Sequence, residues 1–369
     1  MNKWNWFNLG EIDWINTQSI WHAAALSRSR GYQEHDMIFI DWPNRPFISC
    51  GMHQIIELEI DVDYCENNGI PYIRRACGGG QVYLDGNQIF YQPVFLTDNK
   101  VVPRRIDKMY ETLLAPVVAT YQDYGIEAAY KPVNDIVVNS RKISGNGAGQ
   151  HEKASFVVGN FILTFPRKEM ARVLLVPDEK FRDKVYKNLE VGITSFLDEI
   201  GVIPSRDKLI TKYKENFQEL LGVEFIDGEI HEETWKIVKK LNTSYFKEKW
   251  RYLVEKRGSS DLVKTVKIRK GLHIVQSLHK SPGGLIRALL EFDVENSLVQ
   301  DVLISGDFTI NPSRAVKSIE NALKYKRVDE DQLLKVLEEL FREENIQSPG
   351  FTTADLVKVI VQGYKSIKD

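Results

Sequence analysis

The stretch Arg74-Arg75-Ala76-Cys77-Gly78-Gly79-Gly80-Gln81-Val82-Tyr83-Leu84-Asp85 places two guanidinium groups directly before three glycines. Glycine lets the backbone approach a ligand closely, so several N–H groups can point at one anion. Strand-forming residues at 71–73 and 88–91 flank the segment and place the glycines at the rim of a sheet. The stretch therefore predicts a site for a phosphate or carboxylate, although three glycines are also typical of a mobile hairpin turn.

A second segment, Arg141-Lys142-Ile143-Ser144-Gly145-Asn146, puts a lysine ahead of another glycine turn. Strands are expected on either side of it, at 135–139 and 155–165, so Lys142 is expected in a loop. Its ammonium group would reach the same anion as the triple glycine. A solvated loop lysine is the ordinary alternative, but the flanking pairs Asn134-Asp135 and Ser144-Gly145 favour the anion site.

Hydrophobic periodicity predicts an α+β fold. In the first part, helices are expected at 17–29, 105–124 and 205–221, and strands at 37–40, 46–48, 71–73, 88–91, 135–139 and 155–165. The polar segment 256–261 is the best linker candidate. Beyond it, four strands are expected at 265–270, 272–279, 285–293 and 298–305, followed by helices at 312–325, 329–344 and 352–364.

The predicted organisation is a large domain at 1–254 and a small α+β accessory domain at 255–369. The large domain should hold a mixed, mostly antiparallel sheet with flanking helices. This pattern excludes a doubly wound nucleotide-binding fold, because helices and strands do not alternate as that fold requires.

Composition narrows the class of protein. With 369 residues, a net charge of −2 and 27% charged residues, the chain has no overall field for nucleic acid or an anionic membrane. Its three cysteines fit neither a disulfide framework nor a paired metal motif, which favours a reducing, cytoplasmic compartment. No signal peptide and no membrane-spanning stretch is apparent. The histidines are scattered singly, so a histidine-ligated metal is not expected.

The two glycine segments resemble the signatures of lipoate–protein ligases. Residues 74–85 are similar to that family's Arg-Arg-x-Ser-Gly-Gly-Gly-x-Val-x-His-Asp, and residues 134–145 resemble the signature that carries its essential lysine. Further similarities are Ser49-Cys50-Gly51-Met52-His53-Gln54 to a Gly-Arg-x-Gln turn and Gly159-Asn160-Phe161-Ile162-Leu163 to a Gly-Thr-Leu-Leu strand. Tyr245–Trp250 and Ser305-Gly306-Asp307-Phe308 resemble, respectively, the end of the family's catalytic domain and a strand end in its accessory domain.

The resemblance implies an ATP-dependent enzyme of the biotin/lipoate ligase superfamily. Such an enzyme activates lipoate to lipoyl-AMP, with Mg²⁺, and transfers the lipoyl group to a lysine of a partner. Lys142 would be catalytic, stabilising the charge of the adenylate. The acceptors implied are the acyltransferase subunits of 2-oxoacid dehydrogenases, the glycine-cleavage H protein or an H-protein-like carrier. The substrate- and nucleotide-binding residues implied are Arg75, Cys77, Gly78, Gly79, Gly80, Val82, Asp85, Asn134, Asp135, Lys142, Ser144 and Gly145.

Several roles stay open at this level. Asp135 would orient Lys142 or bind Mg²⁺, Asp85 would touch ligand or cap a turn, and Arg74 would bind an anion or form a structural ion pair. The chain also departs from the signatures: Cys77, Leu84 and Met52 replace the usual serine, histidine and arginine, and Gly147-Ala148-Gly149 lacks the usual Ala-x-Arg. These departures put the substrate, lipoate or octanoate, in question more than the reaction class.

Two other functions compete with the ligase. An octanoyl- or lipoyltransferase of the same fold would use a cysteine thioester without ATP, and Cys77 near Arg75 is a candidate nucleophile. However, the resemblance places the transferases' cysteine elsewhere. A non-catalytic lipoyl-binding protein is the third possibility, and the presence of Lys142 argues against it. Biotin ligases share the fold but use a different arginine-glycine motif.

Overall fold

The chain divides into two compact units, each built from more than one segment. A computed structural model describes residues 2–254, 265–269 and 271–368. The first unit comprises Met1–Cys50, Ile56–Ala76 and Gln81–Leu253, and the second comprises Gly51–Ile55, Cys77–Gly80 and Val254–Asp369. The predicted linker at 256–261 lies outside the described residues, and the domain boundary at 254/255 stays a prediction.

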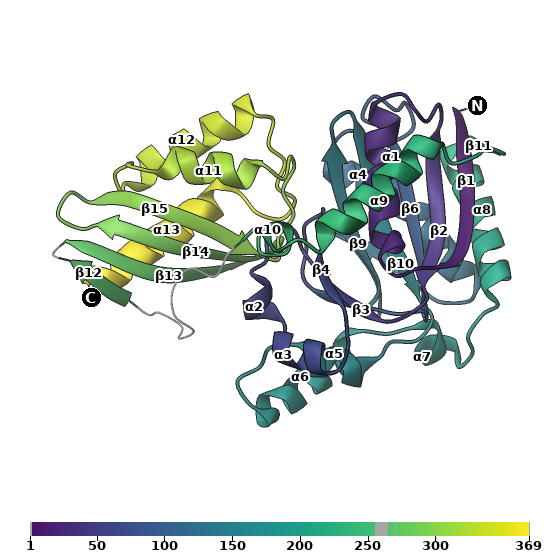
Figure 1. Ribbon diagram of the computed structural model, residues 1–369, viewed down its shortest axis with the longest axis horizontal. Helices are drawn as coiled ribbons and strands as arrows, with labels where there is room; N and C mark the ends of the chain where they lie inside the picture. The colour runs from purple at the N-terminus through teal and green to yellow at the C-terminus, as the bar shows by residue number, and fades with distance from the viewer. Residues whose placement is uncertain (1, 255–264, 270, 369) are drawn as a thin grey trace. The chain divides into compact units, whose positions relative to one another are not determined.

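The first unit is organised around an eight-stranded sheet of order β11-β1-β2-β6-β10-β9-β8-β7 (Figure 1). β1 pairs in parallel with both β11 and β2, and all other neighbours are antiparallel. A three-stranded sheet, β4-β3-β5, lies beside the triple-glycine segment in the sequence. The predicted α+β class with a mixed, mostly antiparallel sheet is therefore confirmed. The strands are β1 Asn2–Ile12, β2 Asp36–Pro43, β3 Phe47–Cys50, β4 Tyr72–Arg74, β5 Val82–Leu84, β6 Gln88–Leu96, β7 Ala129–Lys131, β8 Asp135–Val138, β9 Arg141–His151, β10 Ala154–Ile162 and β11 Val223–Ile226.

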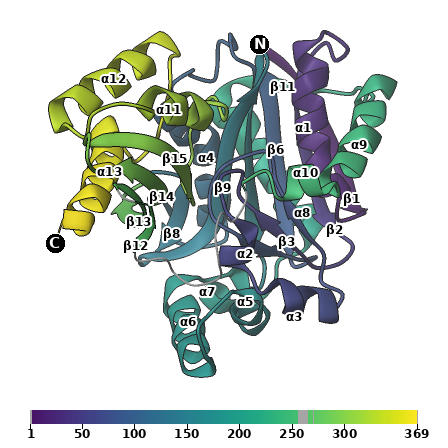
Figure 2. The same ribbon diagram turned by 60° about the vertical axis from the view of Figure 1, so that its left-hand side comes forward.

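Helices cover both faces of the large sheet. Consecutive residues of β10 show the two faces: Phe156 packs on Trp21 of α1, with ring centroids 4.5 Å apart, whereas Val157 joins the core shared with α4 and α8. Figure 2 shows α1 and α9 side by side, as their packing contacts also require. The helices are α1 Asn16–Ser29, α2 Ile56–Glu59, α3 Val62–Asn67, α4 Ile106–Asp123, α5 Arg167–Val173, α6 Glu179–Gly192, α7 Phe196–Ile200, α8 Arg206–Leu221, α9 Glu232–Tyr245 and α10 Glu248–Arg251.

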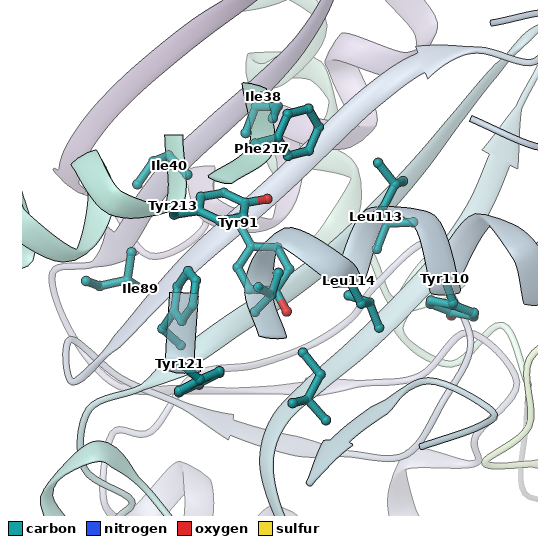
Figure 3. Packing of buried hydrophobic residues seen from close by; sticks show 14 of the residues in the cluster. Ile38, Ile40, Ile89, Tyr91, Tyr110, Leu113, Leu114, Tyr121, Tyr213 and Phe217 are labelled. Carbon is teal, nitrogen blue, oxygen red and sulfur yellow. The ribbon is translucent and has the colours of Figure 1, made fainter. Parts of the chain in front are cut away.

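Aromatic and branched side chains fill the core between the sheet and the α4/α8 face. Tyr91, Tyr121 and Tyr213 meet there among Ile38, Ile40, Leu113, Leu114 and Phe217 (Figure 3). The α4 periodicity predicted from the sequence is confirmed, because Met109, Tyr110, Leu113 and Leu114 are all buried. A cluster of this kind stabilises the sheet through apolar burial and ring packing.

Five strands of the first unit were not predicted: β1, β5, β7, β9 and β11. β1 occupies the N-terminal segment, and β9 carries Lys142, so the lysine lies on a strand and the predicted loop is wrong. Glycines at 145, 147 and 149 lower the intrinsic strand preference of β9. Pairing with β8 and β10 on its two sides determines its conformation instead.

The second unit contains a four-stranded antiparallel sheet of order β12-β13-β14-β15. Alternate residues of β14, from Ile286 to Phe292, are buried in a core shared with the three helices of this unit. All four strands predicted for this part are confirmed. The elements are β12 Thr265–Arg269, β13 Leu272–Ser281, β14 Gly284–Asp293, β15 Leu298–Gly306, α11 Ala315–Leu323, α12 Glu330–Glu343 and α13 Thr353–Lys368. None of the helices that the structure describes is long and apolar enough to cross a membrane.

Candidate functional site

The lysine and an aspartate meet on two paired strands. Lys142 Nζ on β9 lies 2.6 Å from Asp135 Oδ1 on β8, and the two side chains are 36% and 33% exposed. A register shift between Ile136 and Val137 leaves Ile143 as an extra residue on β9, a β-bulge. The result is an ion pair that solvent or a ligand can reach, on a strand buried in the sheet.

Gly145 leaves room for the lysine side chain. It lies opposite Asp135 in the strand pairing, and a Cβ at Gly145 would lie 3.0 Å from Lys142 Cε and 3.3 Å from Nζ. Such contacts are tighter than side chains normally make, so an alanine here would push the ammonium away from Asp135. Glycine at this position thus serves the placement of Lys142 as well as any approach of a ligand.

Amide side chains bind the two strands together. Asn146 Nδ2 donates to the Asn134 carbonyl at 2.9 Å, and Asn134 Nδ2 donates in return to the Asn146 carbonyl. Asn160 on β10 accepts from the Gly145 N–H at 3.0 Å and donates to Gln88 Oε1 at 2.6 Å. These reciprocal bonds fix the backbone on both sides of the Lys142–Asp135 pair.

The segment after α6 holds the other side of the lysine strand. The Thr194 N–H donates to the Lys142 carbonyl at 2.9 Å, and Arg141 forms an ion pair with Glu199 at 2.7 Å. Thr194 Oγ1 donates to the same Glu199 carboxylate at 2.5 Å. The backbone of Lys142 is therefore bonded, while its side chain points to Asp135.

The two arginines of the glycine signature are buried in the first unit. Arg75 donates from Nη1 to the Ser49 carbonyl at 2.7 Å. Arg74 Nε donates to the carbonyls of Trp250 and Arg251, and Trp250 Nε1 donates back to the Arg74 carbonyl at 2.9 Å. Burial lowers the pKa of Arg74 to about 10. Arg74 thus ties the end of the first unit to β4, a structural role.

The triple glycine groups with the second unit rather than with the arginines that precede it. Within that unit the Gly79 N–H donates to the Phe308 carbonyl at 3.2 Å. A Cβ on Gly78 would lie 2.6 Å from the same oxygen and 2.9 Å from Thr309 Cα, whereas at Gly80 the nearest atom would be 3.7 Å away. Close packing on the Gly306-Asp307-Phe308 turn therefore explains why residue 78 is glycine.

Asp85 caps a turn, the second of the two roles that the sequence left open. Its carboxylate accepts from the Asn87 N–H at 2.9 Å and from Asn87 Nδ2 at 3.3 Å. Burial raises the pKa of this carboxyl, and its hydrogen bonds to Asn87 and Gln88 oppose that shift. Val82 is exposed on β5, and Cys77 forms no disulfide and has only 3% of its surface exposed.

The structure thus brings together Asn134, Asp135, Lys142, Ser144 and Gly145, all on or beside β8 and β9. Arg75, Val82 and Asp85 belong to the same unit near β3, β4 and β5, and Cys77–Gly80 belong to the second unit. The sequence prediction missed Tyr91, Tyr121, Asn146, Asn160 and Gln88. Polar residues in otherwise apolar strands, such as Gln88 and Tyr91, were the available signal, since buried polar groups need partners.

Comparison with family models identifies the chain as an enzyme of the biotin/lipoate ligase superfamily. Residues 22–218 match the family model of the lipoyl protein ligase A/B catalytic domain, and residues 275–360 match that of the bacterial lipoate protein ligase C-terminus. The chain belongs to the lipoate–protein ligase family, and the resemblance seen in its motifs is confirmed.

Relatives include both ligases and transferases. The chain is 28% identical to lipoate-protein ligase A subunit 1 of Thermoplasma acidophilum, over 63% of this chain and 90% of that protein. It is 25% identical to the lipoate-protein ligase LplJ of Bacillus subtilis, over 80% of this chain and 82% of that protein. It is 22% identical to the octanoyltransferase LipM of Clostridioides difficile, over 68% of this chain and 98% of that protein.

Solved structures show the same fold. The bipartite lipoate protein ligase of Thermoplasma acidophilum, described with its E2 lipoyl domain, matches 70% of this chain and 99% of its own, with a TM-score of 0.61 and 25% identity. A lipoate-protein ligase A bound with ATP matches 68% of this chain and 98% of its own, with a TM-score of 0.56 and 24% identity. LipL1 of P. falciparum, in complex with lipoate, matches 97% of this chain and 98% of its own, with a TM-score of 0.64 and 14% identity.

Proposed function

We propose that this enzyme is an ATP-dependent lipoate–protein ligase that makes lipoyl-AMP and passes the lipoyl group to a lysine of a lipoyl-domain protein. The observation that carries the proposal is the Lys142–Asp135 pair, 2.6 Å long and a third exposed on a hydrogen-bonded strand. A fixed ammonium of this kind stabilises the negative charge that develops on an α-phosphate and a carboxylate.

The reaction has two steps. A lipoate carboxylate oxygen attacks the α-phosphorus of ATP and pyrophosphate leaves, which converts a poor electrophile into a mixed anhydride. The amine of the acceptor lysine then attacks the acyl carbon, AMP leaves, and the amide forms with loss of one proton. Lys142 would hold the phosphate and carbonyl oxygens in both steps, and Asp135 would orient its ammonium group.

ATP brings Mg²⁺, and the site has a residue that suits it. Mg²⁺ is usually bound by one or two carboxylates together with substrate phosphates, and Asp135 offers one partly exposed carboxylate. Among the described residues no group of three or more His, Cys, Asp or Glu forms a ready metal site. Asp135 would therefore hold the ion only jointly with the nucleotide, where the ion supplies charge neutralisation.

An octanoyltransferase is the second candidate, because several relatives carry that name. The match of residues 275–360 to the C-terminal model of bacterial lipoate ligases favours the ligase. The burial of Cys77 also counts against it as a nucleophile, since a reactive cysteine is partly exposed. The retained Lys142–Asp135 pair argues against a non-catalytic binder.

Isotope exchange between pyrophosphate and ATP, with and without lipoate, tests the proposal. A ligase gives lipoate-dependent exchange, because adenylate formation is reversible. A transferase and a binder give none, and such a result would rule out the proposed activity. Octanoate in place of lipoate then measures which acyl chain is preferred.

Acceptor and compartment are part of the same proposal. A ligase similar to this chain is described with its E2 lipoyl domain, which supports an acyltransferase lipoyl domain as acceptor, with glycine-cleavage H protein or an H-like carrier as the other candidates. Cys50, Cys65 and Cys77 form no disulfide, which is compatible with a reducing cytoplasm. Lipoylation of each purified apo-protein in parallel would identify the acceptor.

A further inference from the structure

The bulge on β9 leaves one residue outside the residue-by-residue pairing with β8. Ile143 has no partner on β8, and the pairing with β10 begins only at Asn146. A buried, unbonded carbonyl is costly, and a bulge without support would relax. Since Ile143 follows Lys142 directly, any relaxation would move the catalytic ammonium.

Tyr121 hydrogen-bonds to the backbone of Ile143. Its hydroxyl, on α4, donates to the Ile143 carbonyl at 2.9 Å and accepts from the Ile162 N–H at 3.4 Å. The side chain is fully buried, and its ring stacks on Phe196 with centroids 4.8 Å apart. The hydroxyl therefore reaches the bulge from a helix whose buried face packs on the sheet.

Tyr91 holds the next residue in the same way. Its hydroxyl lies 2.8 Å from Ser144 Oγ and donates to Asn146 Oδ1 at 2.6 Å. A Cβ at Gly159 would collide with Asn146 Oδ1 and lie 2.5 Å from the Tyr91 ring, so the packing of these two side chains requires a glycine at residue 159. Figure 3 shows Tyr91 and Tyr121 in one cluster of buried side chains.

Both phenols stay protonated in this setting. Burial raises the pKa of Tyr91 and that of Tyr121 above the ordinary value. Each hydroxyl is therefore a hydrogen-bond donor throughout the physiological pH range, and the support does not switch with pH.

We infer that Tyr121 and Tyr91 are positioning residues, which hold the β9 bulge so that Lys142 points at the reacting phosphate and carboxylate. The inference rests on the proposed function of Lys142 and adds the residues that orient its side chain. Neither tyrosine needs to touch substrate, because each acts through the backbone or side chain of residues 143 to 146.

Phenylalanine substitutions test this with little change in packing. In Tyr121→Phe and Tyr91→Phe we expect kcat for lipoate-dependent pyrophosphate exchange to fall by about ten- to a hundredfold, the loss typical of a small misplacement of a catalytic group. The KM values for ATP and lipoate should stay within about twofold. Tyr213→Phe is the matched control: Tyr213 is equally buried in the same cluster, and in the described part of the chain its hydroxyl has no hydrogen-bond partner.

Combining each substitution with Lys142→Ala distinguishes the positioning of Lys142 from a general disturbance of the fold. If the tyrosines act through Lys142, they lose their effect on the residual rate once Lys142 is absent. An equal fold-loss in both backgrounds, or unchanged kcat in both single variants, would overturn the inference. If one variant does not fold, the other still decides.

The proposed function fails separately, if the wild-type enzyme shows no lipoate-dependent exchange or if Lys142→Ala keeps the full rate. Exchange that is normal in the wild type and lost in Lys142→Ala, but insensitive to both tyrosines, leaves the ligase intact and removes only the positioning role.

Discussion

The two signature segments are held in opposite ways. The lysine segment lies within one unit, paired with β8 and, from Asn146 onward, with β10, and bonded through Asn134, Asn146 and Asn160. The glycine segment is divided: Arg75 is bonded inside the first unit, whereas Gly78 and Gly79 pack on the Phe308 turn of the second. The lysine segment is therefore held by a single sheet, whereas Gly78 and Gly79 pack on residues more than 200 positions further along the chain.

Removing Val254–Asp369, the C-terminal part of the second unit, should have the largest effect, and it should affect the two segments differently. We expect residues 1–253 to make no lipoyl-AMP from lipoate and ATP, because the glycine segment loses the residues on which it packs and activation requires ordered loops. The same fragment should still lipoylate an acceptor from premade lipoyl-AMP, since the lysine segment is intact. Circular dichroism would confirm its fold, and activation at the full rate would refute this view of the C-terminal residues.

Lys142→Ala tests the lysine segment alone. The rate of both half-reactions should fall by about two to three orders of magnitude, because one charge-stabilising donor is lost and little packing changes. Steady-state lipoylation and pyrophosphate exchange measure the loss. Lys153→Ala, an exposed lysine near the end of the same strand pair, is the control and should keep its activity. Near-normal turnover in a folded Lys142→Ala enzyme would remove the role assigned here.

Gly78→Ala tests the packing of the glycine segment. The added methyl would meet the Phe308 carbonyl at 2.6 Å, so we expect a loss of about 1–3 kcal/mol in the free energy of unfolding, as for other overpacked sites. Gly80→Ala is the matched control, because its methyl would meet ordinary van der Waals contact at 3.7 Å. Urea unfolding of the two variants should differ, and equal stability would show that residue 78 does not pack as described.

Acid should weaken the unit that holds the lysine strand. Burial and the neighbouring His151 lower the pKa of His22, and burial lowers the pKa of His151, the last residue of β9, to about 4. Unfolded histidine titrates near 6.5, so below that pH the unfolded chain binds more protons. Stability is then complete above about pH 6.5 and falls towards pH 4, by at most about 1.4 kcal/mol per pH unit for each histidine.

Urea unfolding between pH 7.5 and 4.5 measures this slope. His151→Gln should flatten it, because the variant lacks one of the two depressed groups while the carboxylates still titrate. A variant with the slope of the wild type would show that His151 is not the group responsible.

Cys77→Ser should have the smallest effect. A hydroxyl of similar size fits the buried position, and adenylate chemistry needs no thiol, so kcat should stay within about twofold. Lipoylation assays measure it. An inactive but folded variant, together with an acyl-thioester found on the wild type by mass spectrometry, would shift the assignment to a transferase.

The contrast between the segments also explains what could be predicted from the sequence. Helices such as α4 and α8 have strong apolar periodicity, and the Lys142–Asp135 neighbourhood is close in sequence, so both were accessible. β9 was missed because its glycines and polar residues resemble a loop until β8 and β10 pair with it. The support from Tyr121 and Tyr91 was missed because it comes from α4 and β6, and no local pattern encodes which distant hydroxyl meets the bulge.

Because β1 pairs with β11, the large sheet cannot be completed on the ribosome until the residues of β11 have been synthesised. β1 can join β2 early, but its other edge waits for Val223–Ile226, roughly 180 residues after Pro43, or about 10–40 s at ordinary translation speeds. Trp4 and Trp6 lack their final partners Phe217, Tyr213 and Phe225 for the same interval. An unpaired strand edge with exposed tryptophans can associate with other nascent chains. The need for a chaperone during synthesis therefore depends on the position of β11 in the sequence and not on the stability of the completed sheet.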